Sequence, residues 1–192
     1  MRVLDIYKRF DVPPNLQKHM ARVSRLAMFI CNHWKGEKID RNLVKKAGLL
    51  HDIGNIVKFD LETRANFLGE KEIKRVDYWK EVQRKIIEKY GSDDHEVTKR
   101  MLQEIGTDER LVELLGSKTY ANAVSVANSD DWEAKILLYA DLRIGPFGIM
   151  GLKERLDELH KRSEKYRERK DLYIALLEIE EQIQKNLTTK IA

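Results

Sequence analysis

The sequence predicts an all-α protein, a compact helical bundle in which residues 1–192 form a single domain. Apolar residues make up 42% of the chain and charged residues 35%, with only 10 Gly and 3 Pro, and this balance favours helices with solvated outer faces over strands and turns. Apolar residues also recur every three or four positions through most of the chain. A chain of 192 residues can bury one full core but is short for two.

Composition excludes several classes of protein. The single Cys31 cannot form an internal disulfide, and the N-terminal stretch has no basic segment followed by an apolar run and a cleavage site, so we expect a cytoplasmic protein. No apolar run approaches the roughly 20 residues of a membrane span. A net charge of +4, with both signs interspersed, gives no strong signal for nucleic-acid binding.

The first long helix is expected from Leu16 to about His33, with Asn15 as its N-cap after Pro13 and Pro14. His19 follows Leu16 by three positions and precedes Val23 by four, so it shares the apolar face of this helix. An imidazole on an apolar face needs a partner. The alternative is a hydrogen-bonded core histidine.

The second helix should begin after Asp40, a good N-cap, and should carry His51 and Asp52 in its final turn before Gly54 stops it in a left-handed conformation. Alternatively, His51 could interact favourably with the dipole at the C-terminal end of the helix while Asp52 accepts a hydrogen bond from a loop amide. Residues 55–72 lack a clear period and are expected to form a loop or short helical pieces across the mouth of a site.

Later helices are expected over five further segments. Two of them turn a polar side chain inward: His95 shares a face with Thr98 and Leu102, and Asp141 shares one with Leu137 and Leu138. Asp141 could alternatively pair with a buried arginine, for which Arg22 is available. The five segments run from about Asp77 to Tyr90, from Asp93 to Ile105, from Glu109 to Leu115, from the caps Ser129 and Asp130 to Arg143, and from Leu152 to Leu187 as one helix or two.

Three of the expected helices thus turn potential ligands inward, namely His19, His51 with Asp52, and Asp141. Two imidazoles and two carboxylates form a mixed nitrogen and oxygen set that suits Mn²⁺, Fe²⁺, Co²⁺, Ni²⁺, Zn²⁺ or Mg²⁺. Burial of the carboxylates without a cation would cost several kcal/mol each. We therefore expect a divalent metal whose identity the residues leave open.

These residues lie in segments that resemble the HD superfamily of metal-dependent phosphohydrolases. The central motif is Leu49-Leu50-His51-Asp52-Ile53-Gly54, the first lies in Lys18-His19-Met20-Ala21-Arg22-Val23, and the last is Tyr139-Ala140-Asp141 with Leu142-Arg143 and a trailing Pro146. The resemblance covers about residues 15–160, including Gly151 to Leu156, and leaves residues 161–192 as a C-terminal helical extension. It implies an HD-type bundle with a long C-terminal helix or helix pair.

The resemblance implies hydrolysis of a phosphate ester or anhydride by a metal-activated water, in a nucleotide or small phosphorylated metabolite. Asp52 would hold the metal and orient or deprotonate the water. Many members carry Lys after the Ile-Gly pair, where this chain has Asn55, so Lys58 is a candidate replacement and Arg22 and Arg143 are further candidates for phosphate contact. His95 is a candidate second metal ligand, with a capping or second-shell role as the alternative.

An alternative function is a non-catalytic or regulatory HD-type module that binds a nucleotide or a protein partner. The retained ligand set favours the enzyme. A homodimer is a further expectation, formed through the tail, whose apolar residues are Leu176, Leu177, Ile179 and Ile183. The charge-rich run from Lys161 to Asp171 is expected to be a solvated helix face.

Overall fold

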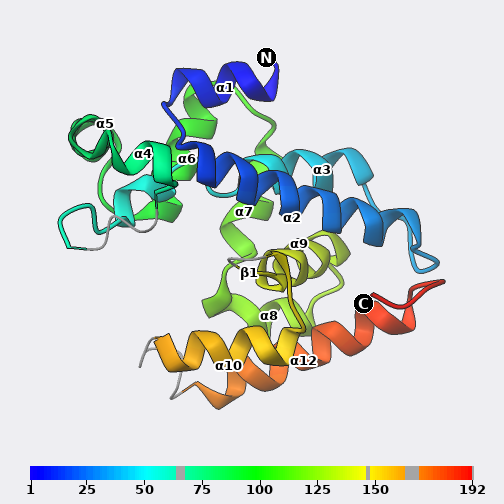
Figure 1. Ribbon diagram of the computed structural model, residues 1–192. Helices are drawn as coiled ribbons and strands as arrows, with labels where there is room; N and C mark the ends of the chain where they lie inside the picture. The colour runs from blue at the N-terminus through cyan, green and yellow to red at the C-terminus, as the bar shows by residue number, and fades with distance from the viewer. Residues whose placement is uncertain (64–67, 146–147, 163–168, 192) are drawn as a thin grey trace. The chain divides into compact units, whose positions relative to one another are not determined.

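The computed structural model describes residues 1–63, 68–145, 148–162 and 169–191. It confirms the all-α class, since a single two-stranded sheet accompanies the helices of these ranges (Figure 1). The chain divides into two compact units, residues 1–21 with 49–112 and residues 22–48 with 113–192. The boundaries fall within the helices α2 (Pro14–Asn32), α3 (Arg41–Leu50) and α7 (Glu109–Ser117). Every helix in the described ranges is too short or too polar to span a membrane.

The first unit is held by the packing of α5, α6 and η1 on one another. Val97, Met101 and Leu102 of α6 are fully buried, as are Ile53 and Ile56 around η1. In addition to the parts of α2, α3 and α7 that it contains, this unit comprises α1 (Val3–Arg9), η1 (Asn55–Lys58), α4 (Glu70–Ile73), α5 (Val76–Tyr90) and α6 (Asp94–Glu104).

The second unit is built around α12, which packs on α8, α9 and α10. The strands β1 and β2 form an antiparallel hairpin in which Ile144 faces Ile149 and Gly145 faces Gly148. The elements of this unit after α7 are η3 (Tyr120–Asn122), α8 (Ala123–Asn128), α9 (Trp132–Arg143), β1 (Ile144–Gly145), β2 (Gly148–Ile149), α10 (Leu152–Arg162) and α12 (Lys170–Lys185). Pro146 of the last motif lies outside the described residues.

Local signals account for several helix ends, and the predicted cap Asp40 is confirmed. A carboxylate oxygen of Asp40 accepts from the Asn42 and Leu43 amides, and Asp93 accepts from the Glu96 amide. The cap of α9 is Asp131, which accepts from the Ala134 amide, so the prediction of Ser129 and Asp130 was wrong by one or two positions. Gly91 and Gly106 end their helices with positive φ.

Three features were not predicted. Helix α1 is only seven residues long, and its apolar Ile6 and Tyr7 are buried. Helix α8 and the strands of the hairpin are shorter still, so neither is long enough to show a periodic pattern of apolar residues.

The C-terminal segment contains the two helices α10 and α12, and most of the charge-rich run between them lies outside the described residues. Leu176, Ile179 and Ile183 are at most 1% exposed within the second unit. These side chains are therefore core residues, and the prediction that they face another copy was wrong. The homodimer itself stays a prediction.

Glu104 joins three helices of the first unit. Its carboxylate accepts from Arg9 of α1 at 2.8 Å and from Tyr90 of α5 at 2.6 Å, and it pairs with Lys89 at 2.7 Å. Hydrogen bonds from Lys89, Tyr90 and Arg9 lower the pKa of Glu104 to about 2. The folded state therefore favours the ionised carboxylate.

We predict that the stability difference between wild type and Glu104→Gln depends on pH. Because the pKa is lowered on folding, the contribution of Glu104 should be complete above the unfolded value near 4.5 and should be lost as pH falls toward 2. Urea titrations at several pH values measure it, with Glu178→Gln on the exposed face of α12 as the control. A difference that does not change with pH would contradict the prediction.

Gly54 does not stop α3 in a left-handed conformation as predicted, because its φ is −92°. Its backbone instead lies against α6, where a Cβ would come within 2.8 Å of the Thr98 amide nitrogen, the Thr98 Oγ1 and the Val97 Cγ1. The Gly54 amide donates to Thr98 Oγ1 at 3.2 Å. Glycine is needed here for a close approach.

We predict that Gly54→Ala destabilises the protein by about 1–3 kcal/mol, because the backbone of α6 must move to admit the methyl group. The control is Gly116→Ala in α7, where a Cβ meets nothing within 4 Å and helix propensity favours alanine. Denaturant unfolding compares the two. An equal free energy of unfolding for Gly54→Ala and wild type would contradict the prediction, because it would mean that α6 moves without loss of stability.

Candidate metal centre

The central motif forms a turn immediately after α3. The helix ends at Leu50, so His51 and Asp52 lie immediately after it rather than in its final turn as predicted. Ile53 and Ile56 are fully buried and fix the turn and the following η1 in the core of the first unit. His51 has no exposed side-chain surface, whereas Asp52 retains 18%. The pair thus presents one buried imidazole and one partly accessible carboxylate.

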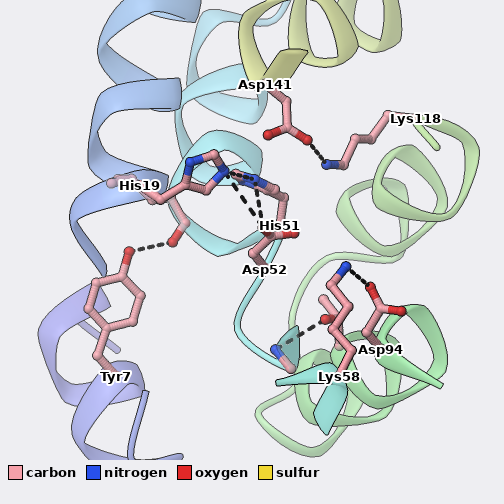
Figure 2. Close-up of polar contacts among 11 residues, drawn as sticks. Tyr7, His19, His51, Asp52, Lys58, Asp94, Lys118 and Asp141 are labelled. Atoms are coloured by element: carbon pink, nitrogen blue, oxygen red, sulfur yellow. Dashed lines mark hydrogen bonds and ion pairs between the residues drawn. The ribbon is translucent and has the colours of Figure 1, made fainter. Parts of the chain in front are cut away.

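Three side chains from distant parts of the first unit fix this turn. Besides the bond from Gly54 to Thr98, the Tyr7 hydroxyl of α1 donates to the carbonyl of Leu49 at 2.5 Å (Figure 2). Gln83 of α5 donates to the carbonyls of Ile56 at 2.7 Å and Phe59 at 2.8 Å. The bonds to Leu49 and Phe59 give partners to carbonyls at the ends of α3 and η1, and the Ile56 carbonyl accepts from Gln83 in addition to the Phe59 amide. Burial raises the pKa of Tyr7 to about 12, so its hydroxyl stays a donor.

His19 reaches the same turn from α2. Its Nε2 lies 3.3 Å from the Nε2 of His51, and Asp52 Oδ2 lies 3.6 Å from His19 Nε2 and 3.5 Å from His51 Nε2 (Figure 2). The His19 side chain is 26% exposed. The structure therefore brings together three of the four predicted ligands within one unit.

The chemistry of this trio fits a divalent cation. Ligand atoms about 2.0–2.1 Å from a tetrahedral ion lie about 3.4 Å apart, close to the separations among these three atoms. Two imidazoles and one carboxylate are also a donor set that suits several transition metals. Without a cation, the two Nε2 atoms at 3.3 Å can share at most one proton between neutral rings. The trio could therefore hold a metal ion.

Asp141 lies in the last turn of α9, in the second unit, and its side chain is 25% exposed. The Lys118 ammonium donates to Asp141 Oδ2 at 2.9 Å, and the Lys118 side chain is only 5% exposed (Figure 2). The cation beside Asp141 is thus Lys118, whereas Arg22, considered above as its partner, is exposed on α2. No motif marks Lys118, and sequence reasoning therefore missed it.

His95 is exposed on α6, which corrects the prediction that it points inward. The buried face of that helix carries Val97, Thr98 and Met101 instead. The neighbouring Asp94 accepts a hydrogen bond from Lys58 at 2.7 Å (Figure 2). A role for His95 as a second metal ligand stays a prediction.

Arg143 is only 3% exposed in the second unit. Its guanidinium donates to the Met150 carbonyl and to the Tyr139 hydroxyl oxygen, and it lies 3.7 Å from Glu180. These contacts join α9, α12 and the residue after the hairpin. A phosphate contact by Arg143 stays a prediction.

The family model described as HD domain matches residues 16–142, two thirds of the chain. The match includes His19, His51, Asp52 and Asp141. The chain therefore belongs to the HD family, whose members are generally metal-dependent phosphohydrolases. No curated protein and no solved structure matches the chain.

We predict that Asp141→Asn destabilises the metal-free protein by about 1–3 kcal/mol, because it leaves the buried Lys118 ammonium without its carboxylate. Lys118→Met removes the same pair from the other side. The double variant should lose less stability than the sum of the single losses, with a coupling of about 1 kcal/mol or more. Unfolding in the presence of a chelator measures this cycle. Additive losses would show that the two groups do not interact in solution.

Proposed function

We propose that this protein is a phosphohydrolase in which His19, His51, Asp52 and Asp141 hold a divalent metal. The observation that carries the proposal is the trio of ligand atoms 3.3–3.6 Å apart where His19 of α2 meets the turn after α3. Membership of the HD family supports the reaction class and the fourth ligand. Asp141 suits that role because it is an incompletely buried carboxylate in the last turn of a helix.

Each residue of the trio has a distinct task. The fully buried His51 is a fixed ligand, and the partly exposed His19 and Asp52 border the accessible side. A bound divalent ion supplies Lewis acidity and lowers the pKa of water toward neutrality. Asp52 Oδ2 faces the two imidazoles, so the other carboxylate oxygen can accept a hydrogen bond from the attacking water and then its proton.

We further propose that the substrate is a nucleotide or a small phosphorylated metabolite. The negative charge that develops on phosphoryl oxygens calls for a cation at the mouth of the site. Lys58 is the candidate that replaces the missing family lysine, and its side chain is 53% exposed. Its ion pair with Asp94 would hold the ammonium at one place, and Arg22 and Arg143 are the remaining candidates.

The alternative is a regulatory module that binds a nucleotide or a protein partner without turnover. One observation favours it, namely the Lys118 ammonium on Asp141, since an internal cation can neutralise that carboxylate without any metal. The two functions differ in metal content and in turnover.

We predict that wild type purified without chelator holds about one or two equivalents of a transition metal and that the His51→Ala, Asp52→Ala variant holds less than about a tenth of this, because two ligands are lost. Elemental analysis measures the content, and circular dichroism checks that the variant is folded. The matched control is His33→Ala, Asp130→Ala, which removes a histidine and a carboxylate outside the trio and should retain the metal.

Turnover is then measured with the metal found, on nucleoside mono-, di- and triphosphates and on a chromogenic phosphate ester. Asp52→Ala should lower kcat/KM by at least about 100-fold. Wild type that stays empty after incubation with Mn²⁺, Co²⁺ and Ni²⁺ would refute the metal centre. Metal binding without turnover of any phosphate compound would favour the regulatory module.

A further inference from the structure

The second unit contains an open cavity of about 560 Å³ that none of the proposed metal ligands borders, although Arg22, a candidate for phosphate contact above, does. One wall is the middle of α2, a second is the hairpin, and a third is the segment after α12. The apolar side chains on these walls are Leu26, Phe29, Ile144, Ile149 and Ile191. Phe29 is 40% exposed and Ile149 is 59% exposed. Large apolar side chains gathered at one hollow mark a binding surface rather than chance exposure.

Two positive charges border this cavity, on Arg22 and Arg25. They lie three positions apart on α2, so they are neighbours on one helix face. Among the described residues, none that lines the cavity carries a carboxylate. Within the described ranges, neither guanidinium forms an ion pair, in contrast to Arg84 and Arg169, which pair with acidic neighbours. An anion at this place would therefore meet two available cations.

Charged and apolar groups are separated along the α2 wall. Arg22 and Arg25 precede Leu26 and Phe29, and the rise of a helix places Arg22 and Phe29 about 10 Å apart along its axis. One end of the cavity is thus cationic and the other apolar. A volume of about 560 Å³ lies within the ordinary range for sites that bind a small organic molecule.

We propose that this cavity binds a free amphipathic anion, a single-chain molecule with a carboxylate head at Arg22 and Arg25 and an alkyl tail against Phe29, Ile149 and Ile191. The guanidinium groups match a carboxylate in charge and in planar hydrogen-bond geometry. An alkyl tail would cover the apolar surface that Phe29 and Ile149 expose. The site lies within the second unit and requires neither metal nor phosphate turnover, so it does not rest on the proposed function.

The test is a fluorescence titration of the full chain with 11-(dansylamino)undecanoate and, in parallel, with its uncharged methyl ester. Wild type should bind the acid saturably with one site. Arg22→Gln, Arg25→Gln should weaken binding of the acid about tenfold and change binding of the ester little. The matched control is Lys45→Gln, Lys46→Gln, which removes the same charge from exposed positions on α3 and should bind the acid like wild type. Phe29→Ser, Ile149→Ser should weaken binding of both probes.

Three kinds of outcome would overturn the proposal. The first is the absence of saturable binding, or equal loss in the two charge variants. The second is a dimer of the wild type in sedimentation analysis that Phe29→Ser, Ile149→Ser dissociates, which would assign the surface to a second copy. The third is binding to anionic phospholipid vesicles that the arginine variant abolishes while the free acid does not compete, which would assign it to a membrane. Circular dichroism verifies the fold of each variant.

Discussion

The close approach of Gly54 to Thr98 is the constraint on which the turn after α3 depends. Because Gly54 has no Cβ, its amide can donate to Thr98 Oγ1 while Val97 packs beside it. This contact fixes the chain against α6 just after His51 and Asp52. Tyr7 and Gln83 then bind the carbonyls of Leu49 and Ile56, on either side of the His51-Asp52 pair. The positions of His51 and Asp52 are thus set by α1, α5 and α6 together rather than by α3 alone.

Preorganisation of this kind matters for a metal centre. Ligand atoms held 3.3–3.6 Å apart before any ion binds lose little further freedom on coordination. Burial of His51 excludes water from one side, while the partial exposure of His19 and Asp52 leaves the other side accessible. A catalytic centre needs such an open position, whereas a structural one is closed by protein ligands.

The sequence predicted features that depend on local or motif signals. The cap Asp40 acts within three residues of its own position, and His19, His51 and Asp52 follow from order and spacing within one family. Contacts between distant residues leave no such trace. Tyr7 bonds a residue 42 positions away and Lys118 one 23 positions away. His95 was predicted to point inward because it shares helical spacing with Thr98 and Leu102. The buried face of α6 also includes Val97 and Met101, and His95 lies beyond its edge.

The ion pair between Lys118 and Asp141 bears on how the proposed fourth ligand would work. A carboxylate that already accepts a hydrogen bond from a nearly buried ammonium gives up part of its negative charge to that bond. Asp141 would therefore bind a cation more weakly through Oδ2, and its other carboxylate oxygen is the better metal ligand. Lys118 would at the same time hold the Asp141 carboxylate in one orientation when no metal is present. The same bond that lowers the affinity of Asp141 for a metal thus stabilises the metal-free state, so metal binding at this residue is expected to be reversible rather than a condition for folding.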